Sequence, residues 1–117
     1  MIAYRPHNIE FLRKTAKGNL AKQRNLLKTA IKSNLNAISE IALNLKNGNL
    51  PVHPKLRKKL SRYRSTVLKV ANKRISSKKK KQLLLQQGGV LPLLATTFLS
   101  ILAPIIGRSI VNSLNNV

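Results

Sequence analysis

The sequence contains no cysteine, and only two of its 117 residues are acidic, Glu10 and Glu40. The absence of cysteine excludes disulfides, thiol catalysis and cysteine-based zinc sites. The two histidines, His7 and His53, are far apart in the sequence and have no cluster of other potential ligands beside them, so we expect no metal and no cofactor. Because no nucleophile–base combination is present, we also expect that the protein is not an enzyme.

Aromatic residues are scarce as well: Tyr4, Phe11, Tyr63 and Phe98 are the full set. Proteins that hold single-stranded nucleic acids stack the bases on aromatic side chains. Four such residues spread along the chain are too few for a stacking platform. This scarcity favours contact with a duplex, or with phosphates alone.

Basic residues, in contrast, are abundant. Lysine and arginine together number 23, which gives a formal net charge of +21 at pH 7. A compact chain with that charge repels itself, and its two acids cannot compensate for it. A polyanionic partner is the simplest source of counter-charge, and we expect this partner to be duplex DNA, although charge alone does not distinguish DNA from RNA.

The charge is divided unequally along the chain. Residues 1–81 contain 22 of the basic residues and both acids, whereas residues 82–117 contain Arg108 alone. The sequence therefore predicts a basic helical polyanion-binding region over residues 1–81. It predicts an apolar tail over residues 82–117, after a Gly-Gly break.

Apolar residues at helical spacing predict a mainly α-helical protein. One stripe consists of Leu20, Leu27, Ile31, Leu35, Ile38, Ala42 and Leu45. A second consists of Leu56, Leu60, Tyr63, Val67 and Val70. The first helix should end near Lys46, before Gly48, and the second should begin at Pro54. We expect these two helices to form an antiparallel hairpin with a basic surface, preceded by a short helix from about Asn8 to Lys17 and followed by a separate C-terminal apolar helix.

Such a hairpin has little core of its own, so we expect it to be stabilised by self-association into a homo-oligomer or by the polyanion. The candidate nucleic-acid-binding residues are the basic residues of the second helix and of the lysine run that follows it. They are Lys55, Arg57, Lys58, Lys59, Arg62, Arg64, Lys69, Lys73, Arg74, Lys78, Lys79, Lys80 and Lys81. The lysine run can serve as a nuclear-import signal or as a phosphate clamp, and the alternative is a solvated basic linker. No set of base-reading residues is recognisable, so we expect binding to be largely independent of base sequence.

The apolar tail has an uncharged centre of 17 residues, from Val90 to Ile106. This length is at the lower limit for a helix that spans a bilayer. Three interpretations remain open: a membrane-inserted segment, a buried helix, and a piece removed by processing. The residues expected to serve membrane contact or packing are Leu91, Leu94, Phe98, Leu102 and Ile105.

Residues 88–94 read Gly-Gly-Val-Leu-Pro-Leu-Leu, and residues 103–107 read Ala-Pro-Ile-Ile-Gly. This tail resembles the C-terminal part of adenovirus core protein X, and the overall layout resembles related proteins of adintoviruses and Polinton/Maverick elements. The resemblance implies cleavage by an adenovirus-type cysteine protease, with Gly88 and Gly89 before the cut and Val90 after it. The family pattern has Met, Ile or Leu where this chain has Gln86.

Charge and resemblance together indicate a viral core protein of the virion core and host nucleus. It would bind and condense DNA largely without sequence specificity and carry a protease-processed or membrane-active tail. The alternative is a membrane-active or tail-anchored protein whose basic part binds anionic lipid. Basic residues extend back to Arg5, far from the tail, which favours nucleic acid. A ribosomal-type protein would explain the charge but not the tail.

Overall fold

The computed structural model describes residues 2–17 and 19–102, and it confirms a mainly helical protein: these residues form helices, turns and short links, with no strand among them. In chain order the elements are the 3-10 turn η1 (Ile2–Tyr4) and the helices α1 (Pro6–Lys17), α2 (Leu20–Lys28), α3 (Lys32–Lys46), α4 (Pro54–Ser61), α5 (Arg64–Ala71), α6 (Ser77–Gln86) and α7 (Val90–Leu102).

The ends of the helices follow from local chemistry, as predicted for α3 and α4. After Lys46 the chain turns at Gly48, whose φ of 71° lies in the left-handed region. The N–H of Asn49 donates to the carbonyl of Asn44 at 2.9 Å, and the N–H of Gly48 donates to that of Leu45 at 3.2 Å. These two bonds form a Schellman motif, which satisfies carbonyls that the helix end leaves free. Pro54 is the first residue of α4, as expected.

The hairpin prediction is wrong in detail, because each expected long helix is two helices. The first breaks between α2 and α3, and Ile31 becomes the residue that precedes α3. Its side chain is exposed, as is that of Leu20, although both belonged to the predicted stripe. The second breaks at Arg62 and Tyr63, between α4 and α5. Apolar spacing continues in phase across both breaks, so the periodicity does not reveal that the chain changes direction.

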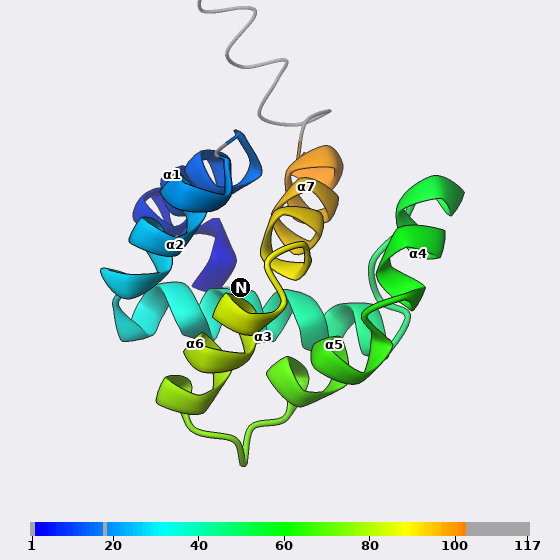
Figure 1. Cartoon of the computed structure of the whole chain (residues 1–117). Coiled ribbons are helices and arrows are strands. Elements are labelled where there is room, and N and C mark those ends of the chain that lie inside the picture. Colours follow the sequence, from blue (N-terminus) through cyan, green and yellow to red (C-terminus); the bar gives the residue numbers. More distant parts are fainter. Residues whose placement is uncertain (1, 18, 103–117) are drawn as a thin grey trace, which may run out of the picture.

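The apolar helix α7 occupies the centre of the molecule, between α1 and α2 on one side and α4 on the other, above α3 (Figure 1). The side chains of Val90, Leu91, Leu94 and Ala95 are fully buried, and Phe98 is nearly so. Burial of each large apolar side chain contributes ~1.5–3 kcal/mol to stability. The expectation of a separate apolar helix is therefore corrected: a helix that is apolar on most sides needs cover, and here the basic helices provide it.

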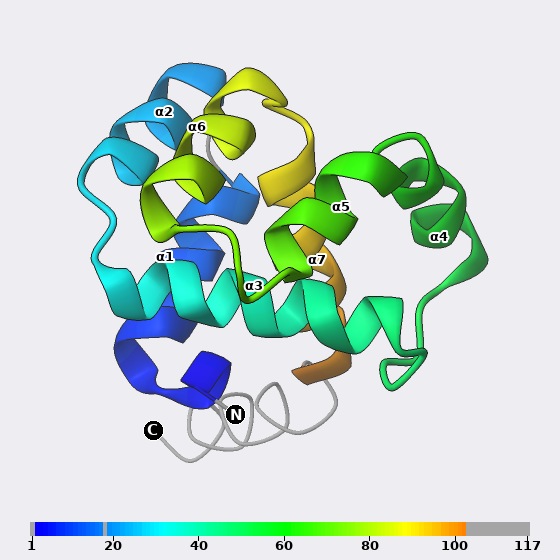
Figure 2. The same ribbon diagram turned by 90° about the horizontal axis from the view of Figure 1, so that it is seen from below.

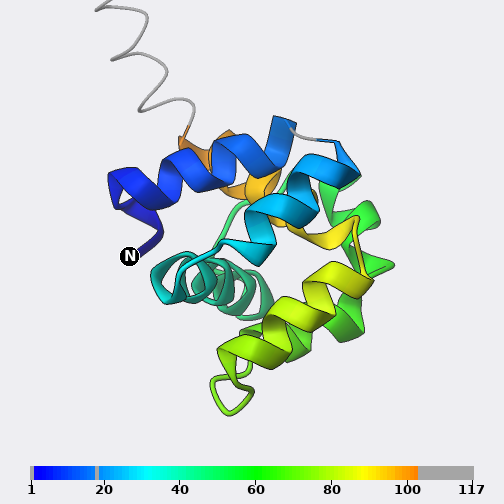
Figure 3. The same ribbon diagram turned by 60° about the vertical axis from the view of Figure 1, so that its left-hand side comes forward.

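Helix α1 provides the largest part of that cover and lies alongside α7 (Figure 3). Phe11 and Leu12 of α1 are buried, and the rings of Tyr4 and Phe98 pack with their centroids 5.5 Å apart. Leu91, Leu94 and Phe98 thus serve packing. The side chain of Leu102 and the whole of Ile105 lie outside the described residues.

Buried amide groups connect η1, α1 and α3. Asn8 is fully buried and donates to the carbonyl of Ile2 at 2.9 Å and to Oγ of Ser33 at 3.1 Å. Asn34 in turn donates to Oδ1 of Asn8 at 2.8 Å. Each buried amide has several partners, which fixes the angle at which α1 crosses the start of α3.

Helix α6 spans the predicted boundary at residue 81 and packs against α2, α3 and α5 (Figure 2). At Gly88 and Gly89 the chain then bends into α7. Among the described residues, no single helix is long and apolar enough to cross a membrane. Helix α6 and residues 90–101 of α7 meet the length and composition criteria only as a pair, with a bend of 102° between them.

Candidate nucleic-acid interface

Positive charge covers the surface with almost no internal compensation. Every lysine and arginine in the described part of the chain is exposed except Lys80 and Lys81. Within the same residues one ion pair forms, between Lys14 and Glu10 at 3.3 Å, and both partners are solvent-exposed. The other acid, Glu40, is half-buried and accepts a long hydrogen bond of 3.4 Å from the N–H of Ala3.

Helices α4 and α5 position the first group of predicted contacts. Leu60 is the buried residue of α4, so the face of the helix that carries it packs inward and the basic residues on the other faces are exposed to solvent. The exposed cations of the two helices are Lys55, Arg57, Lys58, Lys59, Arg62, Arg64 and Lys69. Two of them, Arg62 and Lys69, line a polar hollow of about 300 Å³ together with hydroxyl side chains of α5 and with Gln86 and Gln87. Cations, hydroxyls and amides are the groups that contact phosphate oxygens in protein–DNA complexes.

The lysine run forms the first turns of α6. Ser76 caps the helix by accepting a hydrogen bond from the N–H of Lys79 at 3.2 Å. Lys78 and Lys79 are exposed, whereas Lys80 is only 6 % exposed. Its Nζ donates to Oγ of Ser39 at 3.0 Å, and burial lowers the pKa of Lys80 below its ordinary value.

Lys81 also has an internal role. Its Nζ donates to the carbonyls of Lys28 at 3.1 Å and of Ala30 at 3.4 Å, at the end of α2. A cation is favoured there by the helix dipole and by the free carbonyls. The four lysines therefore divide into two that face solvent and two that hold helices together. A solvated linker does not describe them.

The link between α5 and α6 contributes Lys73 and Arg74, both exposed. Lys73 shares the wall of a cavity of about 650 Å³ with Lys32 of α3 and with Lys80, and the half-buried Glu40 lies on the same wall. The fold thus brings together Lys32 of α3, Lys73 of this link and Lys80 of α6.

A second basic surface lies within the predicted polyanion-binding region, residues 1–81, but outside the candidate contact residues. Arg13, Lys14 and Lys17 of α1 and Lys22 of α2 line a groove of about 700 Å³ between these helices, and Glu10 is the acid in its wall. The signal was present, because Arg13 and Lys17 are four residues apart and share one face of a helix. The predicted interface was confined to residues 55–81 since charge density is highest there.

Of the predicted cleavage residues, Gly88 and Gly89 lie in the turn between α6 and α7, and Val90 is the first residue of α7. Gly88 and Gly89 are half-buried, and Val90 is fully buried. The N–H of Val90 donates to the carbonyl of Gln87 at 3.1 Å. A Cβ atom on Gly88 would lie 2.9 Å from Cδ2 of Leu20, and one on Gly89 would lie 2.6 Å from the hydroxyl of Tyr63. Both glycines therefore allow close packing of the turn, and cleavage requires the turn to open locally.

Comparison of the chain with known protein families, curated proteins and solved structures finds no match.

Proposed function

We propose that the protein binds duplex DNA through its phosphates, largely without regard to base sequence, and condenses it as a core protein of a virus particle in the virion core and host nucleus. The observation that supports this proposal most directly is the exposure of nearly all basic side chains beside a single surface ion pair in the described residues. Each such cation is free to displace a counterion from DNA, and counterion release supplies most of the affinity of sequence-independent binding.

Condensation requires contact with more than one duplex, and the distribution of charge supports this. The groove between α1 and α2 lies on one side of the molecule, and the basic helix α4 lies on the other (Figures 1 and 2). The described chain measures 45 Å along its longest axis. Cations on two sides of so small a body can hold two duplexes next to each other.

The experiment measures binding of the full chain to duplexes of unrelated sequence over a range of salt concentrations. If about eight phosphates are neutralised, log K plotted against log salt has a slope of roughly −7 for every duplex. A shallow slope, or a strong preference for one sequence, would contradict the proposal.

Condensation is tested with two triple variants that remove equal charge from opposite sides. One is Lys58→Gln, Lys59→Gln, Arg62→Gln, and the other is Arg13→Gln, Lys17→Gln, Lys22→Gln. Each is expected to bind a short duplex with a shallower slope of log K against log salt. The magnitude of the slope should fall by about three times 0.9 if all three residues contact phosphates. Each is also expected to lose most of its ability to sediment long DNA. If only one variant impairs sedimentation, the protein does not bridge duplexes through both sides.

The membrane-active alternative predicts that the full chain binds neutral liposomes through its tail. Such binding requires α7 to leave the core, because Leu91, Leu94 and Phe98 are buried. Flotation with neutral and with anionic liposomes separates this alternative from attraction of the lysines to anionic lipid alone.

A further inference from the structure

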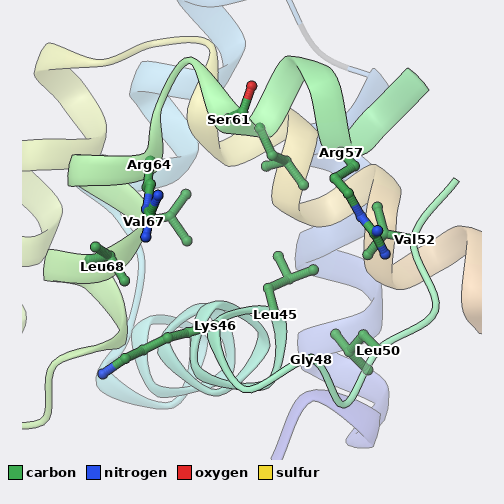
Figure 4. Close-up of a pocket in the computed structure, with 11 residues that line it drawn as sticks. Leu45, Lys46, Gly48, Leu50, Val52, Arg57, Ser61, Arg64, Val67 and Leu68 are labelled. Carbon is green, nitrogen blue, oxygen red and sulfur yellow. The ribbon is translucent and has the colours of Figure 1, made fainter. Parts of the chain in front are cut away.

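An apolar cavity of about 790 Å³ lies between the end of α3, the link that follows it, α4 and α5 (Figure 4). Its walls carry aliphatic side chains from all four segments: Leu45, Leu50, Val52, Leu60, Val67 and Leu68. Pockets that bind small organic ligands measure roughly 300–1,000 Å³ and are lined mainly by such side chains. The cavity is thus large enough for a ligand, and it is distinct from the polar hollow of Arg62 and Lys69.

Cations surround this cavity. Lys46 of α3, Arg57 of α4 and Arg64 of α5 contribute to its lining, and none of the described residues that line it is acidic. In Figure 4 they stand on different sides of the opening, around the aliphatic side chains. Guanidinium groups bind carboxylates through paired hydrogen bonds. The occupant that fits is therefore anionic at one end and apolar along the rest.

Two neutral polar groups of the wall already donate hydrogen bonds within the protein. The hydroxyl of Ser61 donates to the carbonyl of Lys58 at 2.6 Å, and the N–H of Gly48 donates to that of Leu45 at 3.2 Å. A ligand body that needs no hydrogen bonds suits such a wall. An acyl chain meets this condition, whereas the polar side chains of a peptide would lose water without gaining partners.

Other occupants fit less well. A second copy of this chain brings a charge of +21, and of its two acids Glu10 is paired with Lys14 and Glu40 is half-buried. DNA gains nothing from aliphatic walls, because no aromatic side chain among the described residues lines the cavity for base stacking.

We propose that this cavity binds one single-chain anionic amphiphile of the long-chain fatty-acid type, with the acyl chain against Leu45, Leu60 and Val67 and the carboxylate bound by one arginine of the rim, Arg57 or Arg64. The proposal does not depend on DNA binding. It adds a consequence if the protein does bind DNA, because the bound carboxylate would withdraw the arginine that holds it from phosphates.

The test uses the full chain and oleate below its micelle-forming concentration, with isothermal titration calorimetry. Oleate is expected to bind with a stoichiometry of one. Oleyl alcohol, which lacks the charge, and acetate, which lacks the chain, are each expected to bind at least tenfold more weakly.

Two variants and one control locate the site. Arg57→Gln, Arg64→Gln is expected to weaken oleate binding at least tenfold, whereas Arg13→Gln, Arg24→Gln removes the same charge from α1 and α2 and is expected to change it less than twofold. Val52→Phe fills the cavity without altering a cation and is also expected to weaken binding, with circular dichroism verifying that each variant is folded.

Several results would overturn the proposal. One is that many oleate molecules bind and that both double arginine variants lose oleate affinity equally. Another is that the protein binds anionic vesicles but not monomeric oleate. The third is that an acidic peptide binds through Arg57 and Arg64 whereas oleate does not bind.

Discussion

The turn at Gly89 can be tested by substitution, because the sign of the change in the free energy of unfolding depends on how closely the turn packs against Tyr63. A Cβ atom at this position would lie 2.6 Å from the hydroxyl oxygen of Tyr63 and 3.1 Å from its Cζ. Among the described residues Gly48 is the glycine with positive φ, so the backbone at Gly89 accepts an alanine without strain. The substitution Gly89→Ala therefore isolates the steric effect of one methyl group.

Two opposing effects set the magnitude. Forcing an extra methyl group into a packed site costs ~1–3 kcal/mol, and the half-buried ring of Tyr63 can move, which favours the lower part of that range. Alanine in place of glycine also stabilises by ~0.4–1 kcal/mol by restricting the unfolded chain. We expect a net loss of roughly 0.5 kcal/mol, measured by urea unfolding followed by circular dichroism.

The double variant Gly89→Ala, Tyr63→Phe tests the cause, because it removes the hydroxyl that the methyl group meets. In the Tyr63→Phe background the cost of Gly89→Ala is expected to fall because the 2.6 Å contact is gone, but a smaller cost remains because phenylalanine keeps Cζ, 3.1 Å from the methyl group. Gly48→Ala is the matched control: nothing lies within 4 Å of its Cβ, but its φ of 71° makes alanine strained, so its cost should be the same in both backgrounds. If Gly89→Ala stabilises the protein with Tyr63 intact, the close packing of the turn is wrong.

Three further changes have expected outcomes. Gln23 is 2 % exposed, and its Nε2 has no acceptor among the described residues. Gln23→Met is therefore expected to raise the free energy of unfolding by about 1 kcal/mol in urea titrations. A decrease would show that the amide is satisfied. Burial lowers the pKa of Lys80, so between this lowered pKa and 10.5 the unfolded state binds more protons than the folded state, and the free energy of unfolding should rise as the pH increases through this window. Lys80→Met should raise the free energy of unfolding at neutral pH and flatten that rise, as thermal melts at several pH values would show. Phe98→Ala is expected to cost ~3–5 kcal/mol, enough to unfold a marginal domain, which loss of helical circular dichroism at 25 °C would reveal; an unchanged spectrum would place Phe98 outside the core.

Features that depend on neighbouring residues could be read from the sequence, and features that depend on distant ones could not. The end of α3 at Lys46 and the start of α4 at Pro54 were predicted because caps are local chemistry. The break before Ile31 was missed because Thr29 and Ala30 give no strong stop signal. Phe11 and Leu12 were not singled out, since nothing in α1 itself indicates that α7 will cover it.

The same distinction applies to the candidate interface. High charge density predicted the exposed cations of α4 and α5, but density alone could not separate Lys78 and Lys79 from Lys80 and Lys81. That separation depends on Ser39 and on the end of α2, which the fold brings beside α6. Likewise, the apolar composition of the tail is compatible with a bilayer and with a protein interior, and the burial of α7 depends on its packing against α1, α3 and α4.

The pairing of α1 with α7 has a consequence for the order of events during synthesis. A ribosome makes α1 first, but the surface that covers Phe11 and Leu12 is completed only when α7 has emerged. Contacts between segments so distant in the sequence form late and slow the folding of a chain. Until then Phe11 and Leu12 lack the cover that α7 provides. The chain is therefore expected to be most sensitive to proteases before α7 has emerged.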